Sequence, residues 1–197
     1  FSKISWTDKK VVELKNVCLL PGLINAHTHL ELTSLKDKIP YKDSFVQWIR
    51  DIIEVKKTWN ETNYIDSLKL GIKELIESGT TTVTDITTSG LSPQVLLNSN
   101  LRGRIYKEIT GFKYESISQI MAGLNEYLSK LHPTNLVDFG LAPHATYSVN
   151  PQLFIKVAEL AKTYNLPISI HIAEVEDELK LLMSGKGEFI NLLKELA

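Results

Sequence analysis

Two histidines stand one residue apart in the segment PGLINAHTHLE, at the end of an apolar run in a chain that has only five histidines. Side chains two residues apart in a strand point to the same face. We therefore expect His27 and His29 to project together from the carboxyl end of a strand. Two imidazoles on one face are the start of a metal site.

Two further histidines end other predicted strands, His144 in GLAPHATYS and His171 in ISIHIAE. Ligand pockets of parallel α/β folds lie at the carboxyl ends of the strands. Four of the five histidines are therefore expected on one rim, and only His132 stands elsewhere. A single histidine near a strand end is more often a hydrogen-bonded loop residue than a ligand. The concentration of four on one rim, with Glu174 three residues after His171, favours a metal site.

Three imidazoles suit Zn²⁺ or Fe²⁺ and leave a coordination position open for water. Such a cation lowers the pKa of its bound water to ~7, which makes hydroxide available at neutral pH. Glu174 could take the proton from that water and deliver it to a leaving group. The alternative for Glu174 is the solvated start of a helix, where acidic side chains complement the helix dipole. We expect that solvated role for Glu176, Asp177 and Glu178.

The elements that must hold these side chains follow a regular order. Short apolar or β-branched runs alternate with stretches of helical periodicity, which is typical of βα units. The strand runs contain few charges, as expected for a parallel sheet covered on both faces. An open doubly wound sheet and part of a closed (β/α)8 barrel both fit this alternation. We expect strands at residues 23–26, 81–86, 104–109, 137–141 and 168–172.

Apolar residues spaced three and four apart predict the helices between these strands. The first begins near residue 43, and the next ends at Ser78, where Gly79 suits a left-handed cap. Another begins with Asn150 as its N-cap and Pro151 in its first turn. Further helices are expected over residues 114–131, 175–183 and 188–196.

Composition limits the kinds of partner. With 22 basic and 23 acidic side chains the chain has almost no net charge, so we expect no binding to nucleic acid or to anionic lipid. A small-molecule substrate fits better. Cys18 is the single cysteine, which excludes a disulfide within the chain. No run approaches the ~18 apolar residues of a membrane span, and no signal peptide is apparent, so we expect a cytoplasmic protein.

The ends of the chain differ from its middle. Residues 1–20 have the character of one or two strands outside the βα pattern, so we expect a remnant of a small β-domain there, followed by βα units over residues 21–197. The chain begins on Phe1 and stops at LLKELA within a helical pattern. We therefore expect a piece of a longer protein.

The sequence resembles the amidohydrolase superfamily, in the branch that contains cytosine, guanine and adenosylhomocysteine deaminases and the triazine chlorohydrolases. PGLINAHTHLE resembles the metal motif of the first strand in that family. LAPHATYSVNP followed by ISIHIAE resembles the signatures of the fourth and fifth strands, in the expected order. The resemblance covers most of residues 17–180 and is specific for the superfamily, not for the substrate.

This resemblance implies an α/β fold of the (β/α)8 TIM barrel type, of which the chain covers about the first five βα units. It implies one divalent metal, Zn²⁺ first and Fe²⁺ as the alternative, held by His27, His29 and His171. Glu174 would be the proton shuttle and His144 a substrate-binding or polarising group. The binuclear branches use a carboxylated lysine on the fourth strand, and VDFGLAP has none.

Two parts of the family pattern are missing. Full-length relatives carry a histidine after the sixth strand and an aspartate after the eighth, and the aspartate binds the metal and the attacking water. A barrel of this kind needs about 250 residues. We therefore expect the N-terminal portion of an enzyme, which is a poor catalyst alone. Its unclosed sheet edges favour a homo-oligomer or association with the missing C-terminal half.

The implied reaction is hydrolytic deamination of an amino-substituted heterocycle or nucleoside by a metal-activated water, with His144 stabilising the developing charge. Trp48 in SFVQWIRDI and Glu108 in YKEITG are two further candidates for substrate contacts. Core packing is the favoured alternative for Trp48, because its spacing with its apolar neighbours is helical. A salt bridge beside Lys107 is an equal alternative for Glu108.

Within the superfamily, FVQWI resembles aminofutalosine-type deaminases more than adenosylhomocysteine deaminases. Two other functions stay open. One is a hydrolase of the same superfamily that cleaves a cyclic amide or a carbon–chlorine bond with the same metal. The other is a catalytically silent metal-binding fragment, which the absent aspartate favours.

Overall fold

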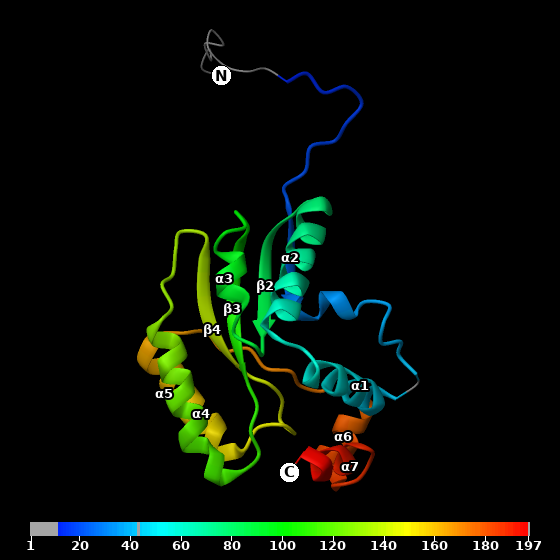
Figure 1. Cartoon of the computed structure of the whole chain (residues 1–197), viewed down its shortest axis with the longest axis vertical. Helices are drawn as coiled ribbons and strands as arrows, with labels where there is room; N and C mark the ends of the chain where they lie inside the picture. Colours follow the sequence, from blue (N-terminus) through cyan, green and yellow to red (C-terminus); the bar gives the residue numbers. More distant parts are fainter. Residues whose placement is uncertain (1–11, 43, 197) are drawn as a thin grey trace.

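A four-stranded parallel sheet forms the centre of the molecule. The computed structural model describes residues 12–42 and 44–196 (Figure 1). Its strands lie side by side in the order in which they occur along the chain, and each neighbouring pair is parallel. The strands are β1 (Leu23–Thr28), β2 (Thr80–Thr87), β3 (Arg102–Ile109) and β4 (Val137–Pro143). Four of the five predicted strands are thereby confirmed.

The fifth predicted strand is formed only in part. Isolated parallel bridges join Leu141 to Ile168 and Ala145 to His171. The amide N–H of Leu141 donates to the carbonyl of Pro167 at 3.0 Å. This segment therefore runs beside β4 in the predicted place, without a continuous ladder of hydrogen bonds. Among the described residues it has a strand neighbour on one side only, so half of its backbone groups lack a sheet partner.

Helices fill the intervals between the strands, in the order that the sequence predicts. The segment predicted as one helix over residues 114–131 is divided into a 3₁₀ turn, η2 (Tyr114–Ser116), and the helix α4. A second 3₁₀ turn, η1 (Leu30–Leu35), directly follows β1. The helices are α1 (Phe45–Lys57), α2 (Glu61–Glu77), α3 (Ser92–Leu96), α4 (Ile117–Ser129), α5 (Pro151–Tyr164), α6 (Glu176–Ser184) and α7 (Phe189–Leu196).

Local side-chain chemistry explains where these helices begin and end. The Asn60 side chain accepts the amide N–H of Asn63, and the Asn63 side chain accepts the amide N–H of Asn60, which forms a capping box at the start of α2. Gly79 follows α2 with φ of 79°, the left-handed conformation that was predicted. Asn150 accepts the N–H of Gln152 and caps α5, as expected.

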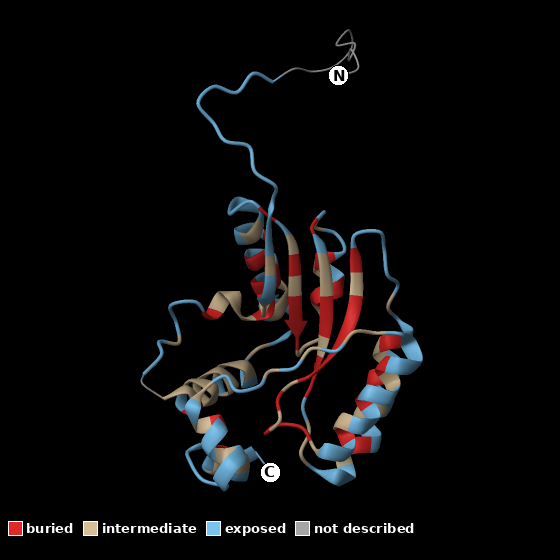
Figure 2. Ribbon diagram, turned by 180° about the vertical axis from the view of Figure 1, so that it is seen from behind, coloured by how far each residue is buried: buried red, intermediate tan, exposed pale blue. Residues whose placement is uncertain are grey.

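Two hydrophobic clusters attach the helices to one face of the sheet. In the first, α2 and α3 pack on β2 and β3; in the second, α4 and α5 pack on the end of β4. Buried residues accordingly concentrate along β2, β3 and β4 (Figure 2). On the opposite face Ile86, Tyr106 and Ala142 form a small separate cluster. Alternate residues of a strand point to opposite faces, so this second face also carries Glu108 of β3, two residues beyond Tyr106.

Residues 12–20 form no helix or strand and are exposed. In Figure 1 they lie apart from the rest of the chain, beyond the start of β1. The small β-domain expected over residues 1–20 falls partly on residues 1–11, which lie outside the described residues, so it stays a prediction. Among the described helices, none is both long and apolar enough to span a membrane.

Candidate metal centre

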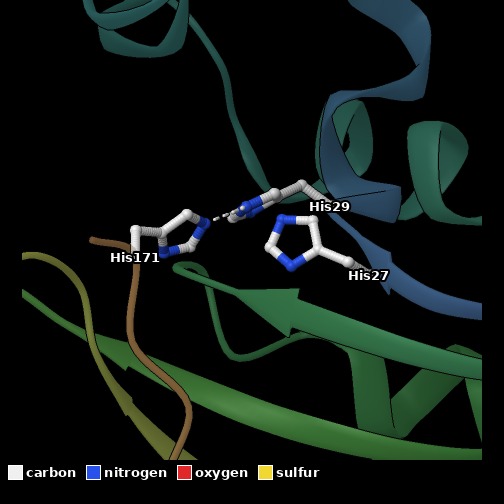
Figure 3. Close-up of side chains that lie close together, drawn as sticks. All are labelled: His27, His29 and His171. Atoms are coloured by element: carbon white, nitrogen blue, oxygen red, sulfur yellow. Dashed lines mark hydrogen bonds between the residues drawn. The ribbon is translucent and has the colours of Figure 1, made fainter. Parts of the chain in front are cut away.

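Three histidines from distant parts of the chain meet at the carboxyl ends of the strands. His27 lies in β1, His29 follows it, and His171 comes from the segment beside β4. One ring nitrogen from each lies within 4.8 Å of those of the other two. The Nε2 atoms of His29 and His171 are 3.3 Å apart, and Figure 3 shows these two rings directed at each other with the His27 ring alongside. The predicted group of imidazoles is therefore assembled.

Backbone hydrogen bonds hold each side of this group. The N–H of Leu30, next to His29, donates to the buried carboxylate of Asp85 in β2 at 2.8 Å. The N–H of His171 donates to the carbonyl of His144 at 2.8 Å. The same carbonyl lies 3.2 Å from Nδ1 of His171, so its Nε2 is the nitrogen presented to His29. A hydrogen bond at Nδ1 commonly fixes the tautomer of a histidine that binds metal through Nε2.

The environment favours the neutral form of His27 and His29. Burial lowers the pKa of His29 to about 4, although the negative charge of Glu108 opposes the shift. Burial and the neighbouring His171 also lower the pKa of His27. A neutral imidazole has a free lone pair for a cation, whereas a protonated one has none. The three side chains could therefore hold one divalent metal.

His144 and Glu108 lie on the same rim. Nδ1 of His144 is 2.6 Å from Oγ of Ser148, and the ring centroids of His144 and His171 are 5.1 Å apart. A carboxylate oxygen of Glu108 and one ring nitrogen each of His144 and His171 lie within 4.8 Å of one another. These two of the three predicted substrate-binding residues thus adjoin the three histidines.

The surroundings of Glu108 rule out the salt bridge considered for it. Its Oε2 accepts a hydrogen bond from the Thr88 hydroxyl at 2.5 Å, and among the described residues its buried Oε1 has no partner. Lys107 points elsewhere, because its Nζ donates to the carbonyl of Thr88 and lies 5.7 Å from the ring centroid of Tyr127. Glu108 therefore presents a free oxygen to the site.

Glu174 lies at the outer side of the site. Glu174 is exposed, and its backbone N–H donates to Oε2 of Glu178 at 2.9 Å. Partial desolvation and the charges of Glu178 and Glu108 raise the pKa of the Glu174 carboxyl, against the opposing effect of His171. The chain turns sharply just before it, at Ala173, which has φ of 56°. The structure places Glu174 near His171 but not within the group of side chains that could share an ion.

One expectation about the acidic run was wrong. Glu178 was predicted to be solvated, yet it is fully buried. Its carboxylate accepts hydrogen bonds from the Glu174 amide and, at 3.1 Å, from the Thr146 hydroxyl. It thus links the first turn of α6 to the loop after β4. Asp177 pairs instead with Lys180 on the surface, in agreement with the prediction for that residue.

Trp48 does not reach the three histidines. It is half-buried on α1, where its ring centroid lies 5.7 Å from that of Phe45. The ring centroid of Phe45 in turn lies 6.4 Å from that of Phe189 in α7. This aromatic group joins α1 to α7, so packing describes the surroundings of Trp48 better than substrate contact does.

Glu31 was not singled out by the sequence analysis, and it is fully buried beside the site. Its carboxylate accepts hydrogen bonds from Lys56 Nζ at 3.1 Å, the Thr87 hydroxyl at 2.9 Å, the Thr88 amide at 3.2 Å, and both the amide and hydroxyl of Ser89 at 3.0 and 2.7 Å. Burial by itself would raise the pKa of Glu31, but Lys56 and Ser89 outweigh it and hold the pKa at about 2. The only signal for Glu31 in the sequence was its place as the acidic residue at the end of PGLINAHTHLE.

Comparison with known proteins identifies the family. Residues 18–196 match the Amidohydrolase family. The chain belongs to this family. A 5'-deoxyadenosine deaminase of Methanocaldococcus jannaschii is 30% identical over 186 residues, which are 90% of this chain and 43% of that protein.

Two solved structures of amidohydrolase-type deaminases resemble the fold. The aminofutalosine deaminase of Helicobacter pylori in complex with methylthio-coformycin has a TM-score of 0.78 and 29% identity, over 88% of this chain and 42% of that one. An adenosine deaminase of Xanthomonas campestris with bound zinc has a TM-score of 0.73 and 26% identity, over 89% of this chain and 42% of that one. The chain thus spans less than half the length of these relatives, and it forms part of a (β/α)8 barrel, as predicted.

Proposed function

We propose that the protein carrying this chain is a metal-dependent hydrolase that removes the amino group of an amino-substituted heterocycle or nucleoside, with adenine nucleosides as the first candidates. The convergence of His27, His29 and His171 within 4.8 Å carries the proposal. The names of the relatives support its direction, because 5'-deoxyadenosine and aminofutalosine deaminases are among them.

The donor set fits one Zn²⁺ or Fe²⁺ ion. Three imidazole nitrogens suit either metal, and the zinc in the Xanthomonas campestris relative favours Zn²⁺. When bound, such an ion lowers the pKa of a coordinated water to about 7 and so supplies the nucleophile. His27, His29 and His171 would hold it.

The other side chains would orient the substrate and move protons. We assign proton transfer to Glu174, because partial desolvation raises its pKa above the ordinary value of a carboxyl group, in the direction that suits a general acid. His144 would polarise the ring of the substrate through Nε2, because Ser148 engages its Nδ1. The free Oε1 of Glu108 would accept a hydrogen bond from the substrate. Trp48 would act indirectly, by packing α1 against α7.

A hollow of about 400 Å³ lies next to Thr88, and Trp59 and Tyr64 form part of its wall. The three histidines, Glu108 and Glu174 are not among the residues that line it. Thr88 donates a hydrogen bond to Glu108, so the hollow and the site have this residue in common.

Ammonia release from a panel of compounds tests the proposal. The intact natural protein, with its metal content measured, is offered adenine nucleosides, aminofutalosine, cytosine, guanine and amino- and chloro-triazines. We expect ammonia from at least one nucleoside, and loss of both metal and turnover in His27→Ala. His132→Ala is the matched control, since His132 lies outside the site. A metal-loaded protein that releases no ammonia from any compound would contradict the assignment, and chloride release alone would favour a chlorohydrolase.

A further inference from the structure

The buried Glu31 carboxylate binds mainly one short segment. Four of its five donors belong to Thr87, Thr88 and Ser89, which form the end of β2 and the turn after it. The fifth donor is Lys56, from α1. A carboxylate that is out of water needs such partners, and hydrogen bonds to a charged group are stronger than neutral ones. Glu31 therefore fixes the turn after β2 against the segment that carries His27 and His29.

Thr88 connects this turn to the substrate side of the site. Its Oγ1 lies 3.3 Å from Lys56 Nζ and 2.5 Å from Glu108 Oε2. An ammonium group can only donate, so the hydroxyl accepts from Lys56, and its single proton is left for Glu108. The direction of both hydrogen bonds is thereby determined. The Thr88 carbonyl is held as well, because it accepts from Lys107.

This arrangement sets the orientation of Glu108. Glu108 is only 8% exposed, and its Oε2 accepts a hydrogen bond from the Thr88 hydroxyl. Oε1 is buried and has no partner among the described residues, and one carboxylate oxygen of Glu108 lies within 4.8 Å of a ring nitrogen of His144 and of His171. Without the hydroxyl, neither carboxylate oxygen would have a partner among the described side chains, and the carboxylate would turn toward another donor.

We propose that Thr88 and Glu31 are positioning residues, which hold the Glu108 carboxylate in the orientation that receives the substrate. Glu31 fixes the turn, and the Thr88 hydroxyl fixes Glu108. The effect on turnover rests on the proposed function, in which Glu108 contacts the substrate. The effect on the orientation of Glu108 does not depend on the proposed function.

A double-mutant cycle in the intact natural protein tests the effect on turnover. Thr88→Val keeps the shape of the side chain and removes its hydroxyl. We expect kcat/KM to fall about tenfold, as for one lost hydrogen bond to a charged group, with metal content unchanged. Thr88→Ser should restore kcat/KM to within about twofold of the wild type. In a Glu108→Gln background, Thr88→Val should change kcat/KM by less than about twofold, because the two side chains act as a unit.

Glu31→Gln provides a second variant, since it introduces an amide donor among five existing donors. It should lower kcat/KM in the same way and, like Thr88→Val, have little effect in the Glu108→Gln background. Two variants are the matched controls. Thr84→Val lies in β2, where Thr84 makes no side-chain hydrogen bond among the described residues, and Glu159→Gln lies on the surface of α5. If Thr88→Val or Glu31→Gln lowers kcat/KM in the Glu108→Gln background by the same factor as in the wild type, the proposal is overturned. Failure of Thr88→Ser to restore turnover would also overturn it.

Crystal structures of Thr88→Val and Thr88→Ser test the positioning without any turnover. We expect the Glu108 carboxylate to shift by about 1 Å or to rotate in the valine variant, a displacement large enough to impair a site. It should keep its place in the serine variant. An unmoved carboxylate in Thr88→Val would overturn the proposal. If no compound of the panel is turned over, the proposed function fails while this comparison still decides the positioning.

Discussion

At the scale of single residues, Asp85 has the least favourable surroundings of the charged groups beside the site. It is fully buried in β2, where Oδ1 accepts the N–H of Leu30 and Oδ2 has no partner among the described residues. Burial raises the pKa of Asp85 to about 6. The carboxyl is therefore partly charged at neutral pH in a place that disfavours the charge.

The pH dependence of folding follows from this shift. The folded-state pKa of Asp85 lies above its ordinary value of 3.8. Its contribution to the free energy of unfolding is therefore fully present below pH 4 and is lost as the pH rises through about 6. Asp85→Asn keeps an acceptor for Leu30 and cannot ionise. We expect it to raise the free energy of unfolding by about 1–3 kcal/mol at pH 7.5 and to give no such gain at pH 4.

Urea denaturation at both pH values measures this difference. Asp66→Asn on the exposed surface of α2 is the control, and it should show no such difference between the two pH values. An equal effect of Asp85→Asn at pH 4 and at pH 7.5 would show that the charge of Asp85 is not the cause.

At the scale of elements, two glycines offer a matched comparison. Gly79 ends α2 with φ of 79°, and Gly123 lies within α4; an added Cβ would meet no atom within 4 Å at either position. An added methyl group would thus be uncrowded at both positions, and the two glycines differ in their backbone conformation. Glycine adopts the left-handed conformation without strain, whereas alanine does not.

Alanine should therefore have opposite effects at these two positions. We expect Gly79→Ala to lower the free energy of unfolding by about 1 kcal/mol and Gly123→Ala to raise it by about 0.5–1 kcal/mol, because alanine favours a helix interior. Thermal denaturation followed by circular dichroism measures both. A loss of stability in Gly123→Ala would contradict the assignment of α4 as an unstrained, solvent-facing helix at that position.

The elements also show what could be predicted from the sequence. Short apolar or β-branched runs located β1 to β4, and a period of three to four residues located most helices. The two-residue period of a strand placed His27 and His29 on one face. The same reasoning could not find the partners of Glu31, because Lys56 and Thr88 lie 25 and 57 residues away along the chain. Such contacts depend on how β1, β2 and α1 pack. For Glu178, the helix start was correct, but its burial against Thr146 depends on the loop after β4.

At the scale of the whole molecule, the sheet has two open edges in the described part of the chain. β1 pairs with β2 alone, and the segment at residues 168–172 adjoins β4 alone. Both edges expose apolar side chains, which favours pairing with another chain. These side chains are Leu23, Ile24, Ile168, Ile170 and Ile172.

We therefore expect residues 1–197, expressed alone, to associate with increasing concentration. Sedimentation velocity over a hundredfold range of concentration measures this association. Ile170→Lys together with Ile172→Lys should weaken it, because a charge on an edge strand disfavours pairing. Lys73→Glu on the surface of α2 is the control. A single monomeric species throughout the range would show that the edges do not associate.

The distance along the chain between His29 and His171 has a consequence for biosynthesis. The two residues are 142 positions apart, yet their Nε2 atoms meet. During translation His27 and His29 leave the ribosome early, and with two ligands they retain an ion only weakly. A full set of imidazoles exists only after residue 171 has emerged and the strands between have paired, since a preformed site is rarely present in an unfolded chain. In the proposed metal enzyme, loading with the ion would thus be a late event in the life of the nascent polypeptide, after the strands that position the imidazoles have paired.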